Sequence, residues 1–134
     1  MPTIGITIGD PSGIGPEIVC KAIASMSPDQ QNNVLLIGNQ DAIARANDLT
    51  NSQLTFTMDG SRKAIRIADV KSQNFSTIRD GMVSEGGGHA AYSYVAHAVD
   101  LANKGTISAL VTAPLNKAAM HLACLLYTSD AADE

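Results

Sequence analysis

A glycine- and proline-rich loop between two apolar segments constrains the fold of this chain most strongly. Residues 9–17 read Gly-Asp-Pro-Ser-Gly-Ile-Gly-Pro-Glu. Over residues 4–8, isoleucine alternates with glycine or threonine, which is typical of a strand. Behind the loop, Pro16 suits the first turn of a helix because its missing N–H would have no intrahelical partner there. Glu17 favours the positive end of the same helix. The segment therefore predicts a strand, a tight loop and a helix N-terminus.

Two roles are open for this loop. Unpaired N–H groups at a helix N-terminus could bind an anionic or strongly polar ligand, with Asp10, Gly13 and Gly15 as the candidate residues. Alternatively, the glycines serve only a tight turn that needs positive φ, and Asp10 hydrogen-bonds its own turn. Neither nucleotide fingerprint is matched: Ile18 stands where the dinucleotide motif needs a third glycine, and no Gly-Lys-Ser/Thr follows.

Helical and strand patterns alternate along the rest of the chain. Periodicity predicts helices over 18–26, 42–49 and 91–102, buried strands over 34–37 and 107–112, and sheet-edge strands over 54–58 and 65–70. Residues 71–84 lack periodicity and predict an irregular crossing. Gly105 is expected as a left-handed cap of the longest helix. This order predicts an α/β protein with a largely parallel sheet.

A second strand-to-helix loop follows the strand expected over 107–112. Thr112, Asn116 and Lys117 would place a hydroxyl, an amide and a cation at a helix start, where a phosphate or carboxylate could bind. The alternative for Lys117 is an ordinary solvated surface lysine.

The cysteines and histidines predict neither a disulfide nor a metal site. Cys20 lies in the first expected helix, where a small buried hydrophobic residue is the favoured interpretation. His89 and His97 are eight residues apart on one helix, about 12 Å of rise, which is too far for one ion. We expect no metal ligand among His89, His97 and His121.

Composition narrows the class of protein. The 134 residues are 45% apolar with a formal net charge of −4, which favours one globular domain and gives no support to nucleic-acid binding. No apolar run reaches the length of a membrane span, and the N-terminus lacks a secretory pattern. We expect a cytoplasmic protein with no membrane partner.

The last eleven residues differ in origin from the rest, in our interpretation. One permitted back-translation of residues 124–134 resembles a transposase end joined to a sequencing adapter. We therefore expect a native portion over residues 1–123 and an artificial tail over 124–134. Without the three acidic residues of this tail, ten acids remain against nine bases, and the net charge is about −1.

Three motifs resemble one enzyme family, in the family's order. They are the loop at 9–17, Ser-Glu-Gly-Gly at 84–87 with Ala-Ala-Tyr at 90–92, and Leu-Val-Thr-Ala-Pro-Leu-Asn-Lys at 110–117. They resemble the 4-hydroxythreonine-4-phosphate dehydrogenases of pyridoxal phosphate biosynthesis, and the first motif is also similar to isocitrate and isopropylmalate dehydrogenases. The resemblance covers residues 3 to about 123. It implies the N-terminal part of an isocitrate/isopropylmalate dehydrogenase-like three-layer α/β/α fold.

The resemblance also implies an activity for the complete protein. It implies NAD-linked oxidation of 4-phosphohydroxy-L-threonine, decarboxylation to 3-amino-2-oxopropyl phosphate, a divalent ion (zinc, magnesium or cobalt) and a homodimer. The family's three metal-binding histidines and its Gly-His-Thr-Glu substrate motif match no residues here, so catalytic residues cannot be assigned and we expect this chain alone to be inactive. A paralogue acting on erythronate or threonate 4-phosphate is the first alternative. The second is a non-catalytic α/β ligand-binding domain.

Overall fold

A computed structural model describes residues 2–59, 64–71, 84–115 and 117–122. In chain order the elements are β1 (Ile4–Thr7), α1 (Gly15–Ala24), α2 (Pro28–Asn32), β2 (Val34–Gly38), α3 (Gln40–Thr50), β3 (Phe56–Thr57), β4 (Ile65–Asp69), α4 (Glu85–Asn103), β5 (Ala109–Thr112) and α5 (Lys117–Leu122).

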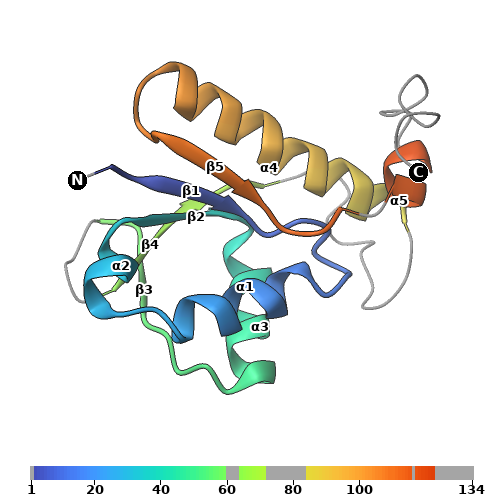
Figure 1. The fold of residues 1–134 in the computed structure, drawn as a ribbon. Helices are drawn as coiled ribbons and strands as arrows, with labels where there is room; N and C mark the ends of the chain where they lie inside the picture. Colours follow the sequence, from blue (N-terminus) through green and yellow to red (C-terminus); the bar gives the residue numbers. More distant parts are fainter. Residues whose placement is uncertain (1, 60–63, 72–83, 116, 123–134) are drawn as a thin grey trace.

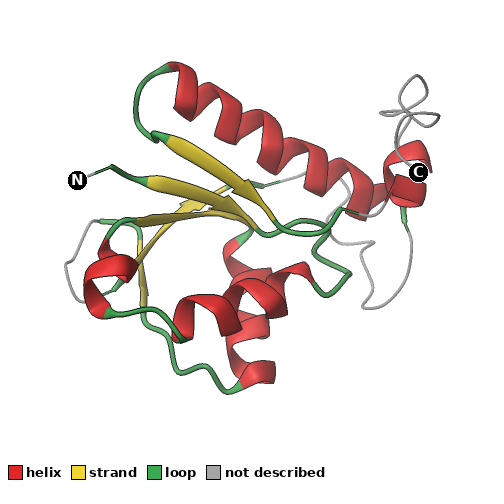
Figure 2. Cartoon of the chain, in the orientation of Figure 1, coloured by secondary structure: helices red, strands yellow, loops and turns green. Residues whose placement is uncertain are grey.

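The strands form one parallel sheet between two layers of helices. Its order is β3-β4-β2-β1-β5, and all four strand pairs are parallel. Figure 1 shows α1 and α3 on one face of the sheet and α4 on the other, and Figure 2 shows the same layers coloured by secondary structure. This confirms the predicted α/β class. Since β1 lies between β2 and β5 and all three are parallel, the loops that follow β1 and β5 both begin at the carboxyl edge of the sheet.

The central strand and its helix form as the alternation predicts. Ile6 and Ile8 are buried with Leu36, Val19 and Ile23, and β1 pairs with β2 from Ile4↔Val34 to Thr7↔Ile37. Pro16 lies in the first turn of α1, where its missing N–H costs no hydrogen bond. The predicted strand, loop and helix are thus confirmed.

Two predictions about strands are wrong. The segment expected as an edge strand over 65–70 contains β4, which lies inside the sheet between β2 and β3. The segment expected as a buried strand over 107–112 contains β5, a sheet-edge strand in which Val111 is 51% exposed. An apolar run indicates a hydrophobic strand. The order of the strands in the sheet decides which strands lie beside it. The short β3, by contrast, lies at an edge as predicted.

The helices differ from the predictions mainly at their N-termini. α4 begins at Glu85, so the glycines at 86–88 lie inside its first turn rather than ahead of it. Ser27 caps an additional short helix, α2, through a capping box with Gln30. At the other end of α4, Gly105 has φ +78°, and Thr106 donates to Leu101 in a Schellman arrangement. The predicted left-handed cap is confirmed.

Some predictions fall outside the described residues. They include most of the irregular crossing expected over 71–84 and the whole tail at 124–134. Among the described residues, none of the helices combines the length and the hydropathy that a membrane span requires.

Candidate functional site

The two predicted strand-to-helix loops lie against each other at the carboxyl edge of the sheet. The Ala113 N–H donates to the Thr7 carbonyl over 3.0 Å, extending the pairing of β1 with β5 beyond the strand ends. Gly9 has φ +74°, and a Cβ there would collide with the Pro114 carbonyl oxygen. The structure therefore brings the β1–α1 and β5–α5 loops together, which is the usual ligand-binding position in a parallel α/β sheet.

Asp10 lies inside this junction and is 2% exposed. Its Oδ1 accepts hydrogen bonds from the Ser12 backbone N–H at 2.9 Å and from the Ser12 hydroxyl at 2.6 Å. Its Oδ2 is buried without a hydrogen-bond partner among the described residues. The local turn expected for Asp10 is thus present, and it leaves half of the carboxylate unsatisfied.

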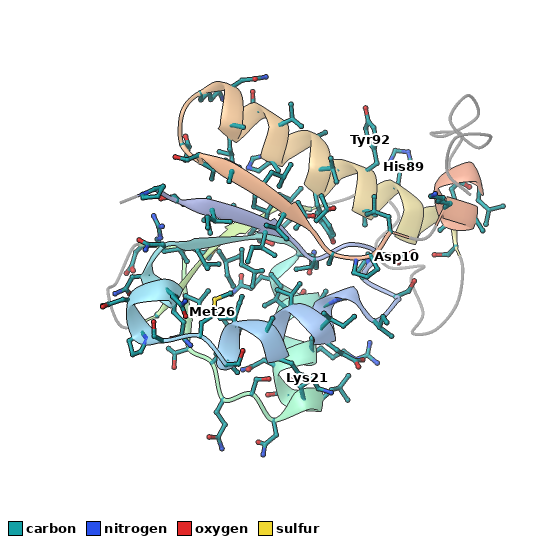
Figure 3. The ribbon with its side chains drawn as sticks, viewed as in Figure 1. Asp10, Lys21, Met26, His89 and Tyr92 are labelled. Carbon is teal, nitrogen blue, oxygen red and sulfur yellow. The ribbon has the colours of Figure 1, made fainter. Side chains whose placement is uncertain are left out.

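The first turn of α4 packs directly against the Asp10 carboxylate. A Cβ at Gly87 would lie 2.6 Å from Asp10 Oδ1 and 3.0 Å from Oδ2, so only glycine leaves room. Ser84 caps α4 by accepting a hydrogen bond from the Gly87 N–H over 3.0 Å. Since the helix N-terminus carries partial positive charge, it is a favourable neighbour for a buried carboxylate. Figure 3 shows Asp10 on the sheet side of this end of α4, and Tyr92 and His89 on the opposite side.

Tyr94 supplies a second buried polar group beneath α4. Its side chain is fully buried, and its hydroxyl has no partner of hydrogen-bond geometry within the described ranges. Burial raises the pKa of Tyr94 well above its ordinary value. The Asn39 backbone lowers this pKa in part, and the negative charges of Asp10 and Asp69 raise it further. The Tyr94 hydroxyl therefore stays neutral and close to the carboxyl ends of β1 and β2.

The carboxyl ends of β2 and β4 add residues that were not predicted as site residues. Asn39 is 6% exposed and caps α3 by accepting from the Asp41 N–H at 2.8 Å. Asp69, at the end of β4, accepts from the Gln40 N–H at 2.9 Å. In the sequence Asn39 reads only as a helix cap and Tyr94 only as part of an apolar stripe. The strand order brings the ends of β1, β2 and β4 to the same edge of the sheet.

Three of the remaining predicted residues are exposed. Gly13 is exposed, Thr112 is the exposed last residue of β5, and Lys117 is the exposed first residue of α5. Asn116 lies outside the described residues. Gly15 is buried, and a Cβ there would collide with the Ile8 carbonyl oxygen and lie 3.3 Å from Ala113. The ligand-binding role of these residues stays a prediction.

The described residues do not form a metal centre. No group of three or more His, Cys, Asp or Glu residues is placed to hold an ion within the described ranges. Cys20 is buried and free, and its thiol lies 3.8 Å from the Ile43 carbonyl oxygen. Burial raises the pKa of this thiol to about 11, so Cys20 is a buried core residue as predicted rather than a nucleophile.

A hollow of about 450 Å³ lies beside α1, on the face of the sheet opposite α4. Its lining is mostly apolar and includes Ile6, Ile18, Met26 and Val111. Of the residues predicted for the site, Thr112 lines it, whereas Asp10, Gly15 and Lys117 do not. The hollow therefore reaches the β5–α5 loop through Ala113 and Pro114, but Asp10 does not line it.

Solved structures resemble this chain in fold and in sequence. A 4-hydroxythreonine-4-phosphate dehydrogenase from Burkholderia phymatum is 35% identical, with a TM-score of 0.83 over 96% of this chain and 41% of its own. The enzyme of the same name from Klebsiella pneumoniae is 30% identical, with a TM-score of 0.81 over 96% of this chain and 42% of its own. A terephthalate 1,2-cis-dihydrodiol dehydrogenase from Burkholderia xenovorans is 31% identical, with a TM-score of 0.75 over 90% of this chain and 36% of its own.

The sequence relatives support the same grouping. A protein from Symbiobacterium thermophilum, provisionally named a D-threonate 4-phosphate dehydrogenase, is 34% identical over 91% of this chain and 38% of its own length. The chain thus spans about two fifths of the length of the relatives it matches. The family model of the pyridoxal phosphate biosynthetic protein PdxA matches residues 30–131. This chain belongs to the PdxA family.

Proposed function

We propose that this chain is the N-terminal part of a PdxA-family dehydrogenase that oxidises the secondary alcohol of a small phosphorylated hydroxy acid. The junction of the β1–α1 and β5–α5 loops at the carboxyl edge of the sheet is the observation that supports a ligand site here. The share of about 40% of each related structure supports the view that a complete enzyme contains further chain.

Two substrates fit this proposal. 4-Phosphohydroxy-L-threonine is the first, because solved structures at 30–35% identity carry the name of that dehydrogenase. D-Threonate 4-phosphate is the second, because relatives at 33–34% identity are named for it. Both are short phosphorylated acids with a secondary alcohol. In this proposal, Lys117 and the N-terminus of α1 contact an anionic group of whichever substrate binds.

The proposed cofactors are NAD and a divalent cation, either zinc, magnesium or cobalt. When bound, NAD would accept the hydride from the alcohol carbon while the hydroxyl proton leaves as H⁺. The resulting β-keto acid would lose CO₂ and take up a proton at the carbon that carried the carboxylate. When bound, the cation would polarise the alcohol and carbonyl oxygens. The described residues do not fit the metal, since they bring no three suitable ligands together, so we assign it to no residue of this chain. A cytoplasmic homodimer acting without nucleic acid or membrane completes the proposal.

The test is an assay of the full-length protein with both substrates. NADH absorbance is followed with 4-phosphohydroxy-L-threonine and with D-threonate 4-phosphate, before and after chelation and with each metal restored. NADH formation that chelation abolishes and metal restores would support the proposal, and the larger kcat/KM would identify the substrate. A protein that binds phosphorylated acids in calorimetry but never reduces NAD would instead be the non-catalytic ligand-binding domain.

A further inference from the structure

The contact between Asp10 and α4 joins two sequence motifs that lie more than seventy residues apart. Asp10 belongs to the β1–α1 loop, and Gly87 belongs to the first turn of α4. The carboxylate fills the space that a side chain at Gly87 would need, with 2.6 Å between Oδ1 and the site of a Cβ. Any lateral movement of the loop against α4 would therefore need movement of the carboxylate as well.

The contacts of Asp10 in this structure are internal, with its own loop and with the first turn of α4. The residue is 2% exposed, and both of its hydrogen bonds to Ser12 reach Oδ1. The negative charge of Asp10 also contributes to the raised pKa of the buried Tyr94 hydroxyl, which belongs to the same helix. The carboxylate thus faces the loop on one side and α4 on the other, while Gly13 and Lys117, which are exposed, face solvent where a ligand would arrive.

We propose that Asp10 is a positioning residue, whose buried carboxylate holds the β1–α1 loop against the glycine turn of α4 and so places the ligand-binding edge of the sheet. The part concerning ligand binding rests on the function proposed above. The part concerning the contact between Asp10 and Gly87, here called the joint, does not, because it follows from the packing of the carboxylate against α4.

Two substitutions separate positioning from direct ligand contact. Asp10→Asn removes the charge, whereas Gly87→Ala keeps the carboxylate but pushes it away from α4. In the full-length protein we expect both to lower kcat/KM by about 10- to 100-fold, because small displacements of binding groups are costly. The double variant should be little worse than the poorer single variant, since both break one contact. Asp48→Asn, at an exposed position of α3, is the matched control.

Hydrogen exchange measured by mass spectrometry tests the joint without any activity. Amides of residues 84–90 should exchange faster in Asp10→Asn and in Gly87→Ala than in the wild type or in Asp48→Asn. If Gly87→Ala does not fold, Ser12→Ala replaces it, because that change removes the 2.6 Å hydroxyl bond to Asp10 and leaves the backbone bond in place. The same faster exchange is then expected.

The outcomes are distinct. A kinetic defect in Asp10→Asn with normal kinetics in Gly87→Ala would show that Asp10 contacts the ligand, and would overturn the inference. Unchanged exchange at residues 84–90 in every variant would overturn it too. If the wild type oxidises neither substrate, the proposed function fails, and faster exchange in the variants would still support the joint.

Discussion

At the scale of single residues, two glycines of one loop have different physical reasons to be glycine. A Cβ at Gly15 would collide with the Ile8 carbonyl oxygen, whereas a Cβ at Gly13 would lie 3.5 Å from its nearest neighbour, the Asp10 carbonyl oxygen. The sequence suggested positive φ for these glycines, but in this loop Gly9 alone has it. Close approach of β1, not backbone conformation, explains Gly15.

We therefore predict a large loss of stability for one alanine substitution and almost none for the other. Gly15→Ala should destabilise the full-length protein by about 2 kcal/mol or more, and Gly15→Val by more still, because the strand end or α1 must move. Gly13→Ala should change stability by less than about 0.5 kcal/mol. Thermal unfolding followed by circular dichroism measures both, and equal melting temperatures for Gly15→Ala and the wild type would show that the contact with Ile8 is soft.

Lys117 carries the second prediction at this scale. It is exposed at the start of α5, beside the junction of the two loops. If it pairs with the phosphate or carboxylate of the substrate, Lys117→Ala should weaken substrate binding by about 1.5 to 3 kcal/mol and leave the melting temperature unchanged. Lys117→Arg should not fully restore binding, since a planar fork replaces a point charge.

Steady-state kinetics with substrate and NAD varied separately measures this effect. Lys21→Ala, at an exposed position of α1, is the control for loss of a surface charge. Values of kcat and KM within about twofold of the control would show that Lys117 is an ordinary solvated surface lysine. A defect confined to NAD would assign Lys117 to the cofactor instead.

At the scale of elements, α4 connects the core to the site. Its buried face includes Ala90, Ala91, Tyr94 and Ala98, and its glycine turn lies against Asp10. The periodicity identified the apolar stripe of this helix, but placed its start after the glycines. Glycine is a poor helix former by intrinsic propensity, so its tolerance in this turn is a tertiary effect.

Two tyrosines of α4 provide a matched comparison. Tyr94 is fully buried and Tyr92 is 46% exposed, so Tyr94→Ala should destabilise the protein by about 3 to 5 kcal/mol and Tyr92→Ala by less than about 1 kcal/mol. Tyr94→Phe should be nearly neutral, because its hydroxyl has no hydrogen-bond partner among the described residues. Denaturant unfolding measures all three. A large loss in Tyr94→Phe would reveal a hydrogen bond, such as one from the Asn39 backbone.

At the scale of the whole molecule, the sheet exposes apolar surface at its β5 side. Ile4 is 36% exposed, Ile18 43% and Val111 51%, and all three line or border the hollow beside α1. Exposed apolar groups next to a free strand edge favour association between chains.

We predict that residues 1–123, expressed alone, associate and show no NADH formation with either substrate. Light scattering and the dehydrogenase assay measure the two properties, with the full-length protein as the control. A monodisperse, stable fragment would favour the ligand-binding domain, and turnover by the fragment would contradict its expected inactivity.

Local sequence patterns determined much of the secondary structure of this protein. The loop at 9–17 indicates a strand, a turn and a helix because glycine, proline and alternation act within a few residues, and the turn of Asp10 with Ser12 is equally local. Three motifs in order identified the family. The tertiary structure alone decided that β4 is interior and β5 is at an edge, since an apolar run does not specify which strands flank it. It also decided that Gly87 lies against Asp10, because contacts between distant segments depend on the strand order and on the face that α4 covers.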